Sequence, residues 1–110
     1  MPFSPGDVVT LAFAGAVDNK RRPAVVVSTA LYQAHRPDVV VSVLTTQLSR
    51  ATAPTDYLLQ DWVQAGLRQP SAFRVYLVTA HRNDLRLIGR LSDRDWQGTQ
   101  ASLRLGLSFS

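Results

Sequence analysis

The sequence predicts a small, mainly β protein with one α-helix at its C-terminal end. Two runs of β-branched apolar residues, at positions 20–28 and 38–47, have the composition of buried strands. Further short apolar stretches are separated by turn residues, and a helix-capping pattern starts at Ser92. Five or six short strands and one terminal helix indicate a small twisted β-barrel, closed to limit exposed strand edges.

The N-terminal half is expected to hold three strands, at residues 8–13, 20–28 and 38–45. Residues 14–19 form a loop between the first two. A helical turn at residues 29–34 joins the second and third strands, and it must end before Pro37 because the residue before a proline disfavours helix. Residues 47–54 are polar and small, which is typical of an exposed loop that carries binding function.

The C-terminal half is expected to hold three more strands, at residues 55–59, 72–79 and 85–91, with a turn or short helical segment at 60–67. In the strand at 72–79 every second residue is predicted to face the core, namely Phe73, Val75, Leu77 and Thr79. The final helix runs from Ser92, the N-cap, to about Leu105. Asp95 takes the acidic position of the capping box, and Trp96 and Leu103 share one face.

Composition limits the class of protein. The 110 residues suit a single domain, 1–110, with one core. The sequence has no cysteine, which excludes disulfides and thiolate metal sites, and with two histidines and no glutamate it shows no transition-metal pattern. We therefore expect no metal and no cofactor. No signal peptide or long apolar segment is apparent, so we expect a cytoplasmic protein without membrane contact.

The charge balance favours a polyanionic partner. The formal net charge is +4 and the pI is near 10.3. Arginine supplies all the positive charge except that of Lys20. Such side chains neutralise phosphates and release counterions.

The two apolar runs carry polar residues at their ends. If they pair as antiparallel strands folded about residues 29–37, Ser28 lies opposite Val39 and Arg22 lies opposite Thr45, whereas a one-residue slip would bring Thr46 there instead. Residues that are directly opposite have Cβ atoms roughly 4.5–5.5 Å apart. A guanidinium and a hydroxyl would then meet at one rim of the sheet, which predicts a phosphate site.

A set of short motifs in fixed order gives the chain a family resemblance. These motifs are Pro5-Gly6-Asp7-Val8-Val9, Lys20-Arg21-Arg22-Pro23-Ala24-Val25-Val26-Val27-Ser28, Leu44-Thr45-Thr46-Gln47, Asp61-Trp62, Ala65-Gly66-Leu67, Pro70-Ser71, Arg74 and Gly89-Arg90-Leu91-Ser92. In this order they resemble the MazF/PemK toxin family of type II toxin-antitoxin systems. The resemblance implies an SH3-like barrel with a C-terminal helix and a homodimer. It also implies a metal-independent endoribonuclease that cleaves single-stranded RNA at a short sequence, and a cognate antitoxin protein as partner.

The family's catalytic residues carry over unevenly. Its arginine before Pro-Ala matches Arg22, and its threonine in the Thr-Gln region matches Thr45. Some members have a glutamate upstream of that arginine, whereas here Asp18 is the only nearby acid and becomes the candidate general base. We further predict RNA contacts from Lys20, Arg21, Thr46, Gln47, Arg50 and Arg74.

Those assignments agree with the chemistry that metal-free RNA cleavage requires. The ribose 2′-OH must attack the adjacent phosphate while charge on the phosphoryl oxygens is stabilised and the leaving 5′-oxygen is protonated. Arg22 suits the stabilising role, because a guanidinium stays protonated at neutral pH and is therefore a poor general base. Thr45 would orient the phosphate.

Two other functions stay open at this point. The absence of glutamate favours a catalytically weak module of the same fold that only binds RNA or an antitoxin. A gyrase-inhibiting toxin also occurs on a similar barrel. In that case the C-terminal helix would contact the target, and nothing would explain the Arg-Pro and Thr-Gln motifs.

Overall fold

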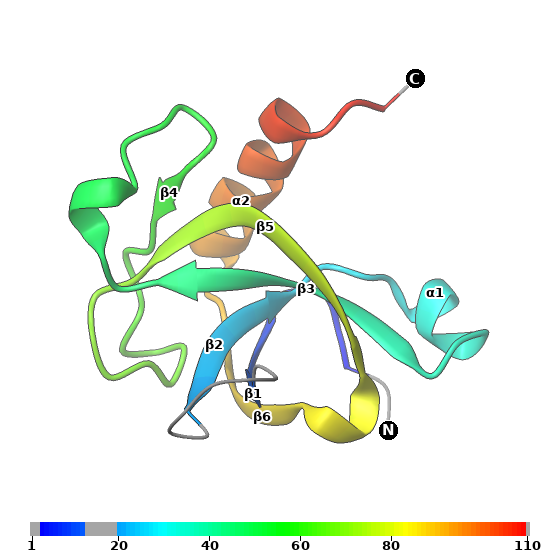
Figure 1. Ribbon diagram of the computed structural model, residues 1–110. Helices are drawn as coiled ribbons and strands as arrows, with labels where there is room; N and C mark the ends of the chain where they lie inside the picture. Colours follow the sequence, from blue (N-terminus) through cyan, green and yellow to red (C-terminus); the bar gives the residue numbers. More distant parts are fainter. Residues whose placement is uncertain (1–2, 13–19, 110) are drawn as a thin grey trace.

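The computed structural model describes residues 3–12 and 20–109. Its elements follow the order β1 (Asp7–Ala12), β2 (Arg21–Val26), α1 (Ala30–Ala34), β3 (Asp38–Thr45), the 3₁₀ turn η1 (Leu48–Arg50), β4 (Tyr57–Leu58), β5 (Ala72–His81), the 3₁₀ turn η2 (Arg82–Asp84), β6 (Arg86–Arg90) and α2 (Asp93–Gly106) (Figure 1). The predicted mainly β fold with a C-terminal helix is confirmed.

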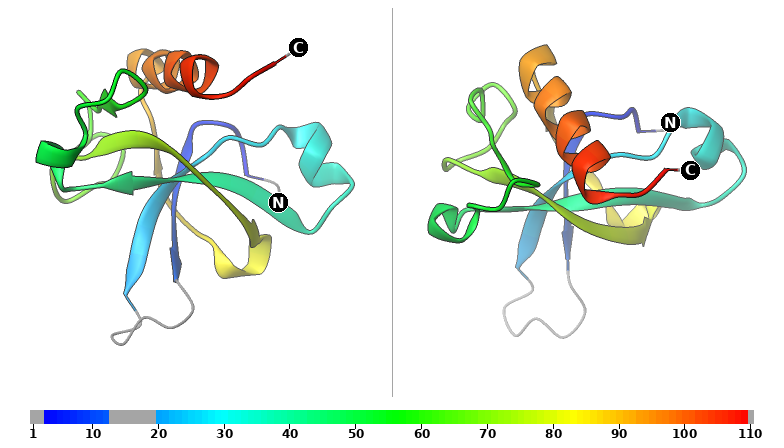
Figure 2. Two further views of the ribbon diagram at one scale, coloured as in Figure 1. Left: turned by 45° about the horizontal axis from the view of Figure 1, so that its top comes forward. Right: turned by 90° about the horizontal axis from the view of Figure 1, so that it is seen from above.

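The six strands form one antiparallel sheet in the order β4-β5-β3-β2-β1-β6. The sheet curls strongly, and α2 lies on one side of it, where it packs against β4 and β5 (Figure 2). Within the described residues β4 and β6 are the two edges and do not pair with each other. The strands therefore make a curled half-barrel, not the fully closed barrel that the sequence suggested.

The predicted register between the second and third strands is correct. Ala24 pairs with Val43, Val25 with Ser42 and Val26 with Val41. The predicted pairing of Arg22 with Thr45 would extend this register by two residues, but the observed pairs end at Ala24 and Val43. The alternative slip toward Thr46 does not fit the register. The predicted pair of Ser28 with Val39 is not formed, because the N–H groups of Val27 and Ser28 both donate to the carbonyl of Val40.

Two hydrophobic clusters lie on opposite faces of the sheet. One contains Val8, Val25, Leu44, Leu59, Ala65, Leu67, Phe73 and Leu91, with Trp62, Trp96 and Leu103 packed against it. The other contains Val9, Leu11, Ala24, Val26, Val39, Val41 and Leu85. Neighbouring residues of β2 enter different clusters, which explains why this strand is apolar without alternation. The expected shared face of Trp96 and Leu103 is confirmed.

The predicted apolar face of β5 is wrong in its second half. Phe73 is buried, but Leu77 and Thr79 are exposed, while Val78 packs against the second cluster. In the pairing with β3, Leu44 lies opposite Phe73, and Ser42 lies opposite Leu77. β5 has two extra residues between these pairs and bends there, but an insertion of two residues preserves the alternation of its side chains. Leu77 is exposed because the buried contacts of β5 pass from the first cluster, at Phe73, to the second cluster on the opposite face, at Val78.

The fourth strand is shorter than predicted, and the segment after it covers the gap between β4 and β6. A Cβ atom on Gly89 would lie 2.1 Å from the carbonyl oxygen of Ala65, and one on Gly66 would lie 2.3 Å from the carbonyl oxygen of Ile88. Gly66 also has a positive φ of 86°. Only glycine permits this approach of two backbones. The turn at residues 60–67 thereby shields the backbone of β6.

The capping-box prediction for α2 is half correct. Ser92 is the N-cap, and its hydroxyl accepts the N–H of Asp95 at 3.3 Å. The carboxylate of Asp95 does not complete the box. It is fully buried and accepts hydrogen bonds from Tyr57, Gln60 and Asp61 instead. Asp95 therefore ties α2 to the segment that follows β4.

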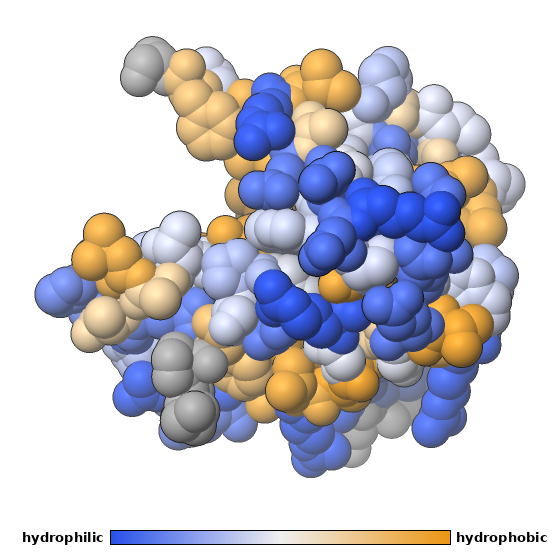
Figure 3. Space-filling model, turned by 180° about the vertical axis from the view of Figure 1, so that it is seen from behind, coloured by the Kyte–Doolittle hydropathy of each residue, from blue (hydrophilic) through white to orange (hydrophobic). Residues whose placement is uncertain are grey.

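The surface seen from behind is mostly hydrophilic, with hydrophobic side chains in separate clusters around its margin (Figure 3). The exposed large apolar side chains include Leu31, Val63, Leu87, Leu105 and Phe109, which come from different elements. In the described part of the chain, no helix has both the length and the apolar character that crossing a membrane would require.

Candidate functional site

A cavity of about 540 Å³ opens where β2 begins and β3 ends. The start of β2, the residue after β3, one residue each of β1 and β6, and the segment at 66–71 meet there. Its lining residues are Thr10, Arg21, Pro23, Thr46, Gly66, Leu67, Arg68, Gln69, Ser71 and Ile88. The lining includes two arginines and no acidic residue, so the cavity is suited to an anionic ligand. We call it the basic cavity.

Arg21 is fixed at the rim of the basic cavity. Its Nε donates to the hydroxyl of Thr10 at 3.0 Å, and its Nη2 donates to the carbonyls of Thr10 and Asp84 at 2.6 and 2.8 Å. These bonds link β2 to β1 and to η2. Because backbone carbonyls hold this guanidinium without neutralising it, its positive charge stays available to the cavity.

Arg22 and Thr45 belong to the other face of the same strand ends. Residues 21 and 23 line the basic cavity, and alternation along β2 directs residue 22 away from it. Arg22 pairs with the buried Leu11 of β1, yet its own side chain is exposed. The last observed pair of β2 and β3 is Ala24 with Val43, and extending this register by two residues would set Arg22 opposite Thr45. The hydroxyl of Thr45, which is partly exposed, accepts the N–H of Gln47 at 3.1 Å.

The remaining predicted site residues are spread around this end of the molecule. Lys20 is exposed and directly precedes β2, and Gln47 is exposed after β3. Arg50 is exposed in η1. Thr46 is exposed and lines the basic cavity. Asp18, the candidate general base, lies outside the described residues.

Arg74 lies on the outer side of β5 and does not line the basic cavity. Its guanidinium is 5.8 Å from the centre of the Tyr76 ring, a cation–π distance. The carbonyl of Arg74 accepts a short hydrogen bond from the buried hydroxyl of Ser42, which in turn accepts the N–H of Tyr76 at 3.0 Å. This contact holds the bend in β5 and presents Arg74 and Tyr76 together on the surface.

Sequence reasoning missed four polar lining residues of the basic cavity, namely Thr10, Arg68, Gln69 and Ser71. Thr10 belongs to β1, and the other three belong to the segment between the turn at 60–67 and β5. Pro70-Ser71 was among the motifs of the family resemblance, and this was the one available signal. Nothing local in the sequence showed that this segment folds back beside the start of β2.

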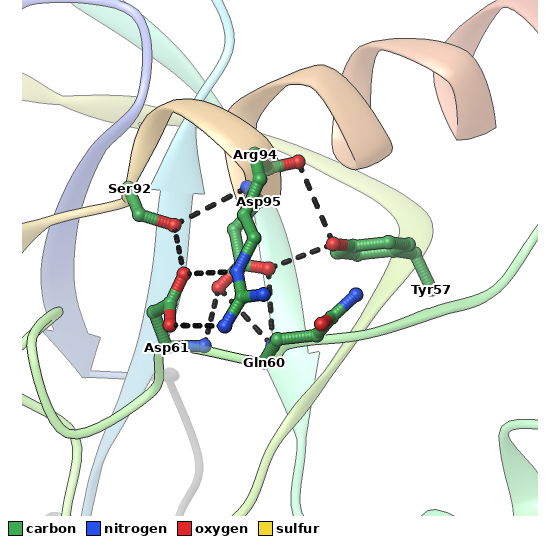
Figure 4. A network of polar contacts seen from close by, with 6 residues as sticks. All are labelled: Tyr57, Gln60, Asp61, Ser92, Arg94 and Asp95. Carbon is green, nitrogen blue, oxygen red and sulfur yellow. Dashed lines mark hydrogen bonds and ion pairs between the residues drawn. The ribbon is translucent and has the colours of Figure 1, made fainter.

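The segment that leads into this wall is anchored to α2 by a polar network (Figure 4). The carboxylate of Asp95 accepts the hydroxyl of Tyr57 at 2.7 Å and the N–H of Asp61 at 2.8 Å. Asp61 in turn forms a bidentate ion pair with Arg94, at 2.7 Å for both bonds, and accepts the Ser92 hydroxyl at 2.6 Å. Two carboxylates, one from each element, thus fix the start of the 60–71 segment.

The network changes the acidity of its members. Hydrogen bonding by Arg94, supported by Ser92, lowers the pKa of Asp61 to about 2. Burial raises the pKa of Tyr57 to about 12, and its hydrogen bond to Asp95 acts in the same direction. Asp61 is therefore a persistent anion and Tyr57 a persistent hydrogen-bond donor, as an anchor requires. Neither group lines the basic cavity.

Within residues 3–12 and 20–109, no group of three or more His, Cys, Asp or Glu residues lies together in a way that would hold a metal ion. The polar side chains near the start of β2 and the end of β3 carry guanidinium, hydroxyl and amide groups. Together they can bind phosphate oxygens and stabilise negative charge on them.

Comparisons with solved structures agree with this fold. An endoribonuclease from a mycobacterial species, solved in complex with its cognate antitoxin, has a TM-score of 0.76 at 21% identity, covering 99% of this chain and 100% of that chain. A MazE-MazF structure from Deinococcus radiodurans has a TM-score of 0.72 at 18% identity, covering 98% and 99%. The Mycobacterium tuberculosis toxin MazF-mt6 has a TM-score of 0.69 at 22% identity, covering 92% and 98%.

Because the sequence identities are low, these structural matches by themselves show only that the fold is shared. No curated protein matches the sequence significantly. The PemK-like, MazF-like toxins of type II toxin-antitoxin systems match it over residues 4–107. This match spans nearly the whole chain and includes β1, the β2–β3 pair, the basic cavity and α2. The chain belongs to the PemK-like, MazF-like toxin family of type II toxin-antitoxin systems.

Proposed function

We propose that this protein is a metal-independent endoribonuclease that cleaves single-stranded RNA, and mRNA in particular, at a short sequence. The observation that carries the proposal is the register of β2 and β3, which, extended two residues beyond the last observed pair, sets Arg22 opposite Thr45 at strand ends whose other face lines a cavity with two arginines and no acid. A guanidinium and a hydroxyl on neighbouring strands suit a single phosphodiester. The cavity on the other face of these strand ends is large enough to take part of a neighbouring nucleotide.

In the proposed reaction the 2′-oxygen attacks the adjacent phosphorus and the bond to the 5′-oxygen breaks. One product then ends in a 2′,3′-cyclic phosphate and the other begins with a 5′-hydroxyl. Arg22 stabilises the additional negative charge on the phosphoryl oxygens and donates a proton to the departing 5′-oxygen, while Thr45 orients the phosphate. A preorganised donor of this kind typically contributes about 10²–10³-fold in rate.

The other assigned residues bind and position the strand. We propose that Lys20, Arg21, Thr46 and Gln47 contact RNA at the β2–β3 end, and that Arg50 and Arg74 extend the contact outward. Arg68, Gln69 and Ser71 join them as the wall of the basic cavity. Asp18 is proposed as the general base that takes the 2′-OH proton, because no glutamate is available in the chain.

The test is cleavage of a long single-stranded RNA in excess EDTA by the wild type and by Arg22→Ala, Arg22→Lys and Thr45→Ala. We expect Arg22→Ala to lose about 10²–10³-fold in kcat with little change in RNA affinity. Arg22→Lys keeps the charge but lacks the planar fork, so it should recover only part of the loss. Arg104→Ala, which removes an exposed arginine from the end of α2, is the charge-matched control and should cleave normally.

The ends of the products test the mechanism separately. Cleavage by 2′-OH attack leaves 5′-hydroxyl ends that a polynucleotide kinase labels without prior phosphatase treatment. Loss of activity in EDTA, or products with 5′-phosphates, would show that the metal-free mechanism is wrong. RNA binding without any cleavage would favour a binding module of the same fold.

We also propose a homodimer that acts in the cytoplasm under the control of a cognate antitoxin. Support comes from the family and from the solved relatives, one described with its cognate antitoxin and another as MazE-MazF. Light scattering of the purified protein should give twice the mass of the 12.1 kDa chain. Co-expression with the product of an adjacent short reading frame should suppress cleavage. A monomer that cleaves RNA normally would contradict the dimer.

A further inference from the structure

A second cavity, of about 410 Å³, lies at the other end of β3. It is lined by Phe3, Ala30, Gln33, Ala34, Arg36, Asp38, Val39 and Arg82. β3 begins at Asp38 here and ends at Thr45 beside the proposed cleavage site. Seven steps along a strand span about 24 Å. This distal cavity is therefore separate from the basic cavity, and the proposed cleavage chemistry does not use it.

The fold brings two distant arginines into this cavity. Asp38 pairs with His81 at the start of the β3–β5 ladder, and the N–H of Arg82 donates to the carbonyl of Pro37 at 3.0 Å. These backbone contacts fix Arg36 and Arg82 beside each other although they are far apart in the sequence. Among the described residues, neither guanidinium forms a hydrogen bond or an ion pair. Both are available to a ligand.

The apolar wall of the distal cavity is held rigidly. The N–H of Phe3 donates to Oε1 of the buried Gln33 at 2.9 Å, and Nε2 of Gln33 donates to the carbonyl of Ser28 at 3.2 Å. This buried amide joins the N-terminal segment, α1 and the end of β2. The backbone of Phe3 is therefore held in place. Its partly buried side chain packs against the second hydrophobic cluster, and the residue gives the cavity part of its apolar lining.

We propose that the distal cavity binds one nucleotide. Arg36 and Arg82 hold its phosphate, Phe3 packs against its base, and Asp38 accepts a hydrogen bond from a sugar hydroxyl or a base amino group. Two unpaired guanidinium groups are the donors that best match phosphate oxygens, and aromatic rings stack on bases of any sequence.

The probe for this site is adenosine 5′-monophosphate, with binding measured by calorimetry and by the amide resonances of Phe3, Gln33 and Val39. We expect Arg36→Ala and Arg82→Ala each to weaken binding about ten-fold, as loss of a charged hydrogen bond to phosphate implies. Asp38→Asn keeps an acceptor oxygen for the sugar or base contact and removes the negative charge near the phosphate, so it should tighten binding of the monophosphate. Arg104→Ala removes the same charge elsewhere and should leave the affinity unchanged.

Three results would overturn the proposal. Adenosine binding as tightly as the monophosphate would exclude a role for the arginines, and inorganic phosphate binding as tightly would exclude the base contact. If Arg104→Ala weakened nucleotide binding as much as Arg36→Ala and Arg82→Ala do, the effect would come from the net charge of the protein and not from this cavity. Thermal melting of each variant shows whether it is folded, and Asp38→Asn tests the site by a gain of affinity, which misfolding cannot mimic.

A competition experiment distinguishes the two sources of such a nucleotide. If a short 2′-O-methyl oligonucleotide displaces adenosine 5′-monophosphate and is itself weakened by Arg82→Ala, the occupant is a nucleotide of the RNA strand. If it does not compete, the occupant is a free nucleotide. Neither measurement requires cleavage, so a protein without ribonuclease activity would still test this site.

Discussion

Oδ2 of Asp95 accepts the backbone N–H of Asp61 at 2.8 Å, although 34 positions separate the two residues. The same carboxylate accepts the N–H of Gln60 at 3.0 Å and the hydroxyl of Tyr57 at 2.7 Å. Three hydrogen-bond donors thus stabilise a carboxylate that is fully buried, and the positive charge of Arg94 also attracts it. The segment that supplies these donors continues into the wall of the basic cavity, so stability and the proposed RNA site are linked through Asp95.

Asp95→Asn should destabilise the protein strongly. The asparagine amide would set an N–H group against at least one of the donors that Asp95 now accepts, and the buried donors would lose a charged partner. We expect the free energy of unfolding to fall by about 2–4 kcal/mol in a urea titration. Asp93→Asn, an exposed change in the same turn of α2, should cost less than about 1 kcal/mol. Equal effects would refute the anchoring role.

Tyr57 should ionise far later than an ordinary tyrosine. Its pKa is raised to about 12 from 10.0, first by burial and then by Asp95, so between these values the folded protein holds a proton that the unfolded chain releases. The stabilising contribution is complete below pH 10 and is lost as the pH rises through about 12. In an ultraviolet absorbance titration of Tyr57→Phe, the tyrosine ionisation that occurs at the highest pH in the wild type should be absent. Tyr76→Phe, which changes an exposed ring, should keep that ionisation.

Asp61 should make stability depend on pH at the acid end. Arg94 and Ser92 lower its pKa from 3.8 to about 2, so in this window the unfolded chain binds more protons than the folded protein. The contribution is complete above pH 3.8 and disappears as the pH falls through about 2. Melting temperatures across this range should vary less with pH in Asp61→Asn. The exposed Asp84→Asn should retain the wild-type slope, and a flattened slope there would contradict the assignment.

Gly89→Ala should disturb the turn that covers β6. The new methyl group would lie 2.1 Å from the carbonyl oxygen of Ala65, and no side-chain rotation can relieve a contact with backbone. We expect a loss of about 1–3 kcal/mol in the free energy of unfolding, together with weaker RNA binding through the displaced cavity wall. Gly106→Ala meets only a side-chain methyl of Val75 at 2.9 Å, and its effect should stay within about 1 kcal/mol.

Arg68 should contact an RNA phosphate if the basic cavity is part of the RNA site. Each such contact contributes about −0.7 to the slope of log K against log salt for a single strand. Arg68→Ala should therefore weaken binding of an uncleavable 2′-O-methyl RNA and make the slope shallower by about 0.7. Arg104→Ala should leave the slope unchanged. An unaltered slope in Arg68→Ala would place the strand outside this cavity.

The features that the sequence determined by itself are local or arise from one continuous pattern. The composition of residues 38–45 predicted β3 with its observed bounds, and Ser92 predicted the start of α2. The register of β2 and β3 followed from where the two apolar runs begin and end. Strand propensity, capping and apolar patterning act over a few residues, and they are therefore written directly in the sequence.

Only the tertiary structure decided the features that depend on distant segments. Leu77 is exposed because the buried side of β5 passes from the cluster around Phe73 to the cluster that Val78 joins, on the opposite face of the sheet. Asp95 bonds Gln60 and Asp61 because α2 crosses the end of β4, so its capping-box role is lost. Arg68 and Arg21 share one cavity, and Arg36 and Arg82 another, through chain reversals. Long-range packing selects among many locally acceptable arrangements, and no single window of the sequence encodes that choice.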